Sequence, residues 1–87
     1  MYSQYMGNRQ NVYNTNMDNF YTILGKRIKN ERKLLKLTQE ELSEKCGISP
    51  EYLRLIESGK RRVTLPKLRV LAKIFNLSPS DLLIGLV

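Results

Sequence analysis

The sequence predicts an all-α fold, and three observations lead to this prediction. Apolar residues recur at intervals of three and four along much of the chain, which is the period of a helix with one buried face. Threonine or serine precedes four of the expected helices, in the pattern of helix N-caps. No segment shows the alternation of polar and apolar residues that is typical of a strand. We therefore expect helices joined by short turns.

The chain of 87 residues allows one domain with a modest core. We divide it into a flexible polar N-terminal tail over residues 1–19 and a folded domain over residues 20–87. The tail is rich in Asn, Tyr, Gln and Ser and has few aliphatic side chains, so we expect it to be disordered. Its tyrosines leave two interpretations open, an arm that reaches a partner or a disordered leader.

The first helix is expected from about Phe20 to Leu35, with an apolar stripe on one side and lysines elsewhere. A second helix should run from Gln39 to Cys46. Thr38 and Glu41 before and within it have the spacing of a capping box, in which each side chain bonds the backbone N–H of the other residue.

Gly47 suits a left-handed C-cap after the second helix. Ser49 is a good N-cap for the third helix, and Pro50 stands at its first position, where the missing N–H costs nothing. This helix spans residues 50–58 and is followed by a loop over residues 60–63.

Thr64 should cap a fourth helix from Leu65 to about Phe75, and Ser78 a short fifth helix that ends at Leu83 or Ile84. The helical spacing then predicts which side chains face inward. They are Leu24, Ile28, Leu35, Leu42, Cys46, Ile48, Leu53, Ile56, Leu68, Leu71, Ala72 and Phe75.

The net charge of +7 lies entirely in residues 22–87, because Arg9 and Asp18 cancel in the preceding segment. A basic folded domain favours an acidic partner. A membrane surface is a poorer candidate, since no expected helix combines a Lys/Arg face with a Trp/Phe face.

Cys46 is the only cysteine and there is no histidine. An intrachain disulfide is therefore impossible, a zinc site is disfavoured, and the commonest general base is missing. We expect no catalytic residues, no bound metal, no cofactor and no enzymatic activity. Because no apolar run is long enough to span a bilayer and no signal peptide is evident, we expect a cytoplasmic protein.

The short turn around Gly47 should bring the second and third helices together at a steep angle, as in a helix-turn-helix. Beyond this geometry, several segments resemble the lambda-repressor/Cro (XRE-type) helix-turn-helix family over roughly residues 24–83. They are Thr38-Gln39-Glu40-Glu41-Leu42, Gly47-Ile48-Ser49, Ile56-Glu57-Ser58-Gly59-Lys60 and the set Leu68, Leu71, Ala72 and Leu77. The resemblance implies a five-helix domain that binds double-stranded DNA, usually as a homodimer, and acts as a transcriptional regulator, here a repressor.

The resemblance places the exposed side of the third helix in the major groove, and its base-reading residues would be Ser49, Pro50, Glu51, Arg54 and Leu55. Arg54 suits guanine or a phosphate, and Leu55 suits a thymine methyl group. Glu51 is open between accepting from cytosine and stabilising the first helical turn. The family usually has Gln, Ser, Asn or Lys where Pro50, Glu51 and Leu55 stand.

Residues expected to bind DNA phosphate are Thr38, Gln39, Lys60, Arg61 and Arg62. Gln39 matches a family position that holds a phosphate, at a helix start whose free N–H groups favour an anion. The three cations after the third helix suit phosphate clamping, or else form a solvated charge run.

Arg32 and Glu57 match a family ion pair and are assigned to architecture. Ser43 stands where the family usually has Ala, and is small enough for close helix packing. We expect Cys46 to be a small buried hydrophobe.

The C-terminal segment, residues 82–87, is apolar enough to complete the core and to contact a second copy. Two functions from different classes remain. One is a sequence-specific DNA-binding regulator, and the other is an antitoxin-like interaction module that also binds DNA and captures a protein partner through its N-terminal tail.

Overall fold

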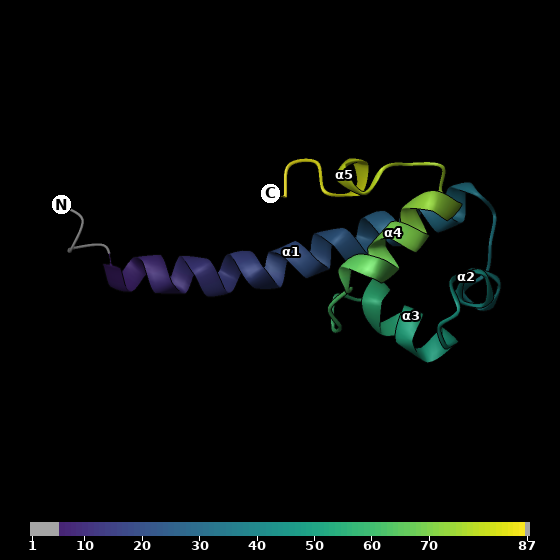
Figure 1. Cartoon of the computed structure of the whole chain (residues 1–87). Helices are drawn as coiled ribbons and strands as arrows, with labels where there is room; N and C mark the ends of the chain where they lie inside the picture. The colour runs from purple at the N-terminus through teal and green to yellow at the C-terminus, as the bar shows by residue number, and fades with distance from the viewer. Residues whose placement is uncertain (1–5, 87) are drawn as a thin grey trace.

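The fold is a bundle of helices, seen in a computed structural model that describes the backbone of residues 6–86 and the side chains from residue 19 onward. Over these residues there is no strand, which confirms the all-α prediction. The helices are α1 (Met6–Leu34), α2 (Gln39–Cys46), α3 (Pro50–Glu57), α4 (Leu65–Ile74) and α5 (Pro79–Leu82) (Figure 1).

Helix α1 begins at Met6, well before the start expected at about Phe20. Its N-terminal half projects past the other helices (Figure 1). The polar composition suggested a tail, but the segment has no proline, and asparagine or tyrosine disfavours a helix by less than about 1 kcal/mol each. A helix anchored at Leu24 and Ile28 can therefore extend backwards. The flexibility of residues 1–19 stays a prediction, and residues 1–5 lie outside the described part of the chain.

The core lies between the C-terminal half of α1 and the four shorter helices. The buried apolar side chains are Leu24, Ile28, Leu42, Cys46, Leu53, Ile56, Leu68, Leu71, Ala72, Phe75 and Leu82. These include ten of the twelve side chains predicted to face inward, and an eleventh, Ile48, packs against the core while partly exposed. The helical spacing thus identified most of the core.

Leu35 is the exception, since its side chain is 46% exposed. Helix α1 ends at Leu34, and the next turn is closed by Lys36 with φ of 59°. Because this turn leaves the helical path, Leu35 no longer shares a face with Ile28. Leu37 packs against the core instead.

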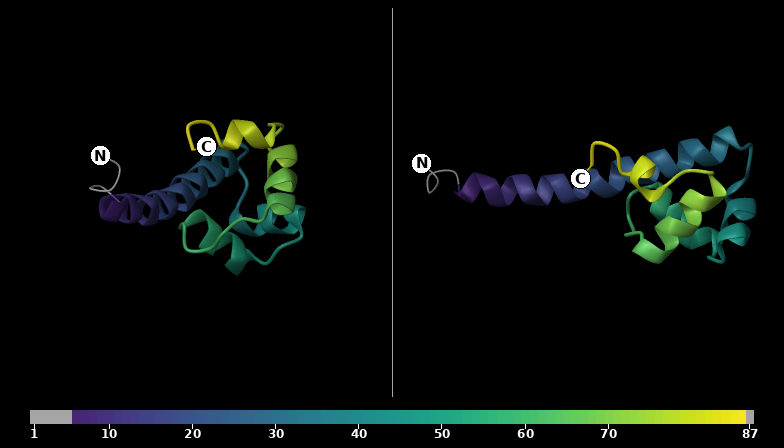
Figure 2. Two further views of the ribbon diagram at one scale, coloured as in Figure 1. Left: turned by 60° about the vertical axis from the view of Figure 1, so that its left-hand side comes forward. Right: turned by 45° about the horizontal axis from the view of Figure 1, so that its top comes forward.

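The turn between α2 and α3 forms as its residues predict. Thr38 and Glu41 make both hydrogen bonds of the capping box at the start of α2. Gly47 ends α2 with φ of 72° in the left-handed region, and Ser49 Oγ accepts from the backbone N–H of Tyr52 at the start of α3. Two further views show how this turn sets α3 across α2 (Figure 2).

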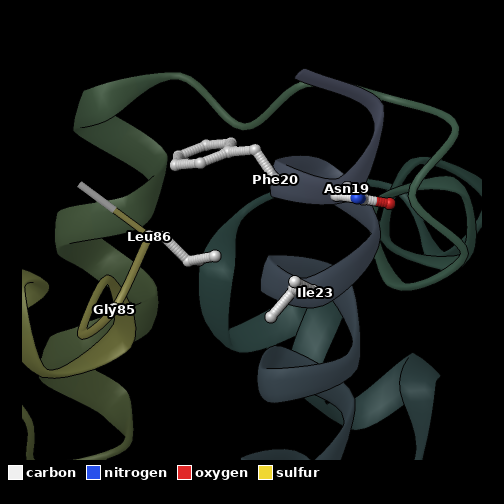
Figure 3. Close-up of a pocket in the computed structure, with 5 residues that line it drawn as sticks. All are labelled: Asn19, Phe20, Ile23, Gly85 and Leu86. Carbon is white, nitrogen blue, oxygen red and sulfur yellow. The ribbon is translucent and has the colours of Figure 1, made fainter. Parts of the chain in front are cut away.

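Helix α5 is shorter than expected and ends at Leu82, whose side chain is buried. Arg27 of α1 donates from Nη1 to the Leu82 carbonyl at 3.0 Å, which fixes this end of the chain on α1. A pocket remains between α1 and the residues that follow α5. Asn19, Phe20 and Ile23 line it from α1, opposite Gly85 and Leu86 (Figure 3).

Candidate nucleic-acid interface

Helix α3 has one buried face and one exposed face. Leu53 and Ile56 are almost completely buried against the other helices. Four of the five residues expected to read bases are exposed, namely Ser49, Pro50, Glu51 and Arg54, while Leu55 is partly exposed. The helix-turn-helix geometry thus presents these residues together, on one side of α3 and at its N-terminus.

Glu51 and Arg54 form a forked ion pair on this exposed face. Arg54 Nε donates to Glu51 Oε1 at 3.1 Å, and Arg54 Nη2 donates to Glu51 Oε2 at 2.5 Å. The hydrogen bonds from Arg54 lower the pKa of the Glu51 carboxyl, and the same bonds raise the pKa of Arg54. Both groups are therefore charged at neutral pH, and the positive charge of Arg54 is compensated until another acceptor displaces Glu51.

The buried carboxylate of Glu57, on the inner side of α3, links this helix to α1 and α2. Arg32 of α1 donates from Nε to Glu57 Oε2 at 2.7 Å and from Nη2 to Glu57 Oε1 at 3.1 Å. Gln39 of α2 donates from Nε2 to the same Oε1 at 3.0 Å. Arg32 also donates to the Leu37 carbonyl, so the charges and donors of this site are satisfied although they are buried.

Gln39 thus directs its side-chain amide inward, to Glu57, and is only partly exposed. The neighbouring Thr38 is exposed, but both its backbone N–H and its hydroxyl are engaged with Glu41.

The basic loop, Lys60 to Arg62, follows α3 directly, and its three side chains are exposed. Gly59 permits the sharp turn at the end of α3 with φ of 80°. A Cβ at this position would lie 2.8 Å from Thr22 Cα, so the loop starts in close contact with α1. The basic loop and the exposed face of α3 lie consecutively in the chain.

Two tyrosines contact this loop, and neither was among the predicted site residues. Tyr52 of α3 donates from its hydroxyl to the Arg62 carbonyl at 3.2 Å, and its ring lies under Arg61. Tyr21 of α1 lies under Arg62. The sequence offered a weak signal for Tyr52 alone, an aromatic residue flanking the exposed side of the third helix.

Lys67 and Cys46 make a separate contact at the end of α2. Lys67 Nζ donates to the Cys46 carbonyl at 3.3 Å, as suits a cation at a helix C-terminus. The Cys46 thiol is buried, and this burial raises its pKa, with an opposing contribution from Lys67. Ser43 is also buried and donates to the Glu40 carbonyl, so its hydroxyl is satisfied inside its own helix.

Comparison with known proteins places these features in a family. Residues 28–82 match the model of a helix-turn-helix family. The control protein C.SmaI of Serratia marcescens is 38% identical over 61 residues, which cover 70% of this chain and 73% of that protein.

Two solved structures have a similar fold. The restriction-modification controller protein C.AhdI of Aeromonas hydrophila has a TM-score of 0.68 and 29% identity, over 71% of this chain and 94% of that one. The clp gene regulator ClgR of Corynebacterium glutamicum has a TM-score of 0.72 and 28% identity, over 77% of this chain and 71% of that one.

The chain therefore belongs to the helix-turn-helix family of transcriptional regulators, and the resemblance to XRE-type proteins is confirmed. It is a DNA-binding regulator of transcription. In the described part of the chain, none of the helices is both long and apolar enough to cross a bilayer.

Proposed function

We propose that this chain is a repressor that binds a specific double-stranded DNA sequence by placing α3 in the major groove, without catalytic turnover and in the cytoplasm. The observation that carries the proposal is the exposed face of α3 with the basic loop directly after it. An α-helix fits the major groove, and neighbouring cations then meet the phosphates on either side.

Sequence preference is assigned to the exposed face of α3. Arg54 would exchange Glu51 for the O6 and N7 atoms of a guanine, which match its fork. Glu51 would then either accept from a cytosine N4 amine or stay beside Arg54 and orient its guanidinium group. Ser49 and Leu55 would contact neighbouring positions, and Pro50 would shape the helix start.

Affinity is assigned mainly to the basic loop. Lys60, Arg61 and Arg62 would contact phosphate oxygens, which position the helix without reading sequence. The start of α2 would add a phosphate contact through Thr38 and the free backbone N–H groups of its first turn. Because Gln39 is bonded to Glu57, its side chain would have to turn outward before it could contribute.

A homodimer would present two α3 helices to half-sites about one turn of DNA apart. The pocket between α1 and the C-terminal residues supports a second copy there (Figure 3). Ile23 on its α1 side is 39% exposed, and Ile84 nearby in the chain is 64% exposed. Covering such apolar side chains would favour association.

Selection of bound sequences from a random pool of DNA duplexes tests this function. We expect one enriched motif with two related halves, and a promoter carrying that motif should lose transcription when the protein is added. Because C.AhdI is described as a restriction-modification controller, genes of such systems are the first promoters to examine. A pool that stays unenriched would contradict sequence-specific binding.

An antitoxin-like role is the second candidate, and the projecting half of α1 favours it (Figure 1). A helix that extends beyond its own bundle offers a surface for a protein partner. Deletion of residues 1–18 separates the two functions. A shortened chain that still binds DNA but no longer captures a partner seen with the full chain would support the interaction module.

A further inference from the structure

Each arginine of the basic loop lies over the ring of a tyrosine. Arg61 Cζ is 5.8 Å from the ring centroid of Tyr52, and Arg62 Cζ is 6.0 Å from the ring centroid of Tyr21. A guanidinium over a tyrosine face is attracted by the charge distribution of the ring. The two tyrosines belong to different helices, α3 and α1, so the two cations are held at separate fixed points.

The backbone of the loop is held as well. Tyr52 donates its hydroxyl hydrogen to the carbonyl of Arg62 at 3.2 Å. At the other end of the loop, the N–H of Lys60 donates to the Leu55 carbonyl at 2.9 Å, while Gly59 lies against Thr22 of α1. The loop is thus anchored on both helices, although the side chains of its three basic residues are exposed.

The charge of the loop also remains available. Within residues 19–86 the two ion pairs join Arg32 with Glu57 and Arg54 with Glu51, and neither Arg61 nor Arg62 takes part in them. An aromatic ring orients a guanidinium without neutralising it, whereas a carboxylate would compete with a phosphate. Tyrosine therefore suits the task of ordering a cation that must later meet an anion.

We propose that Tyr52 and Tyr21 are positioning residues that order Arg61 and Arg62 before DNA arrives. A free arginine side chain loses rotamer freedom when it is fixed on a phosphate, and ordering it in advance removes part of that cost. This inference rests on the proposed phosphate role of the loop. It assigns to two residues outside that loop a share of the affinity for any double-stranded DNA.

Tyr52→Phe gives the sharpest test, because it removes the hydroxyl and keeps the ring. Loss of one hydrogen bond should weaken binding by about three- to tenfold. Because both arginines still release counterions, the plot of log affinity against log salt should shift downward and stay parallel to that of the wild type. Arg62→Ala, by contrast, should flatten the slope by about one unit.

Tyr21 is tested through a conservative pair of variants. Tyr21→Leu removes the ring under Arg62 and should weaken binding by about two- to fivefold. Tyr21→Phe keeps a ring and should bind like the wild type. Equal losses in both variants would contradict the contact through the ring and overturn the assignment of Tyr21.

The measurement uses the full chain with two duplexes, one carrying the selected site and one unrelated. Each tyrosine variant is repeated in an Arg61→Ala, Arg62→Ala background, where the tyrosine changes should no longer matter. The proposal would be overturned if a tyrosine change weakened binding as much in the Arg61→Ala, Arg62→Ala background as it does in the wild type. They would mean that the tyrosines act on the fold or on the DNA directly.

An independent measurement needs no DNA. Nuclear relaxation of the arginine Nε–H groups should show restricted motion of Arg61 and Arg62 in the free protein, with greater motion of Arg61 in Tyr52→Leu and of Arg62 in Tyr21→Leu. Unchanged motion would overturn the positioning role even if the loop binds phosphate. If Arg61→Ala with Arg62→Ala leaves the salt slope intact, the phosphate assignment itself is what fails.

Discussion

At the scale of single residues, two Arg–Glu ion pairs of this protein have different roles. The Arg32–Glu57 pair is buried and shared with Gln39, whereas the Glu51–Arg54 pair is exposed to solvent. Burial makes the first pair costly to break, because a lone charge would stay in the core. Solvent makes the second easy to exchange for another partner.

Arg32→Ala should lower the free energy of unfolding by about 3–5 kcal/mol, because it leaves the Glu57 carboxylate buried without its cation. Urea denaturation followed by circular dichroism measures the loss. Glu51→Gln is the matched control, since it breaks the exposed pair and should leave the denaturation midpoint almost unchanged. Similar losses in both variants would contradict the distinction between the pairs.

Arg54→Ala should relax the base preference at one position of each half-site while the protein still binds DNA. The expected cost at the preferred site is about 1–3 kcal/mol, the value of one good contact to guanine. The check is sequence selection repeated with the variant, with Arg69→Ala on the exposed side of α4 as control. An unchanged motif would remove Arg54 from the base-reading residues.

The pH dependence of binding follows from Glu51 and from composition. The pKa of Glu51 is lowered, so its pairing with Arg54 is present above its ordinary range and is lost only as the pH falls through the lowered value. The chain has no histidine to titrate near neutrality. Binding titrations should therefore give the same affinity from about pH 6 to pH 8, and a step in that interval would contradict this charge assignment.

At the scale of helices, Gly47 and Gly25 are each required for a different structural reason. Gly47 has a positive φ, and a Cβ there would meet only Lys67 Nζ at 4.0 Å, whereas a Cβ on Gly25 would lie 2.3 Å from the Ile56 carbonyl oxygen. The first glycine is needed for its backbone conformation. The second is needed because α1 and α3 pack with their backbones in contact.

Gly47→Ala should destabilise the protein by about 1–2 kcal/mol, the cost of a left-handed conformation with a side chain. Gly25→Ala should cost more, because backbone atoms cannot rotate away as a side chain can, and overpacking alone costs about 1–3 kcal/mol. Thermal unfolding of both variants gives the comparison. A smaller effect at Gly25 would mean that α1 and α3 separate without difficulty.

The helix starts that could be predicted are those with caps. Thr38, Ser49, Thr64 and Ser78 each accept a backbone N–H at the expected helix start, since a cap depends only on residues within four positions. The start of α1 could not be predicted in this way, because no capping residue marks Met6. Gly25 was also missed, because its role depends on Ile56 and Glu57 of α3, which are distant from it in the chain.

At the scale of the whole molecule, the positive charge was readable from the sequence but its organisation was not. Counting Lys and Arg located the excess in the folded part. The contacts of Tyr21 with Arg62 and of Gln39 with Glu57 join distant segments, so no local sequence pattern could predict them. The base-reading and phosphate-binding assignments stay predictions for the same reason, since only bound DNA tests them.

Replacing both Arg61 and Arg62 with Ala should weaken binding to every duplex and lower the salt slope by close to two units. Fluorescence anisotropy at a series of salt concentrations measures both effects. Lys45→Ala with Lys73→Ala removes the same charge from α2 and α4 and serves as the control. A loss confined to one DNA sequence would contradict a phosphate role for the loop.

The carboxylate of Glu57 has a consequence for redesign. It fastens the inner side of α3 to α1 and α2, whereas the outward side chains of Glu51 and Arg54 are 65% and 53% exposed. On the proposed base-reading role of these two side chains, exchanging only Glu51 and Arg54 should change the preferred DNA sequence and leave the free energy of unfolding almost unchanged.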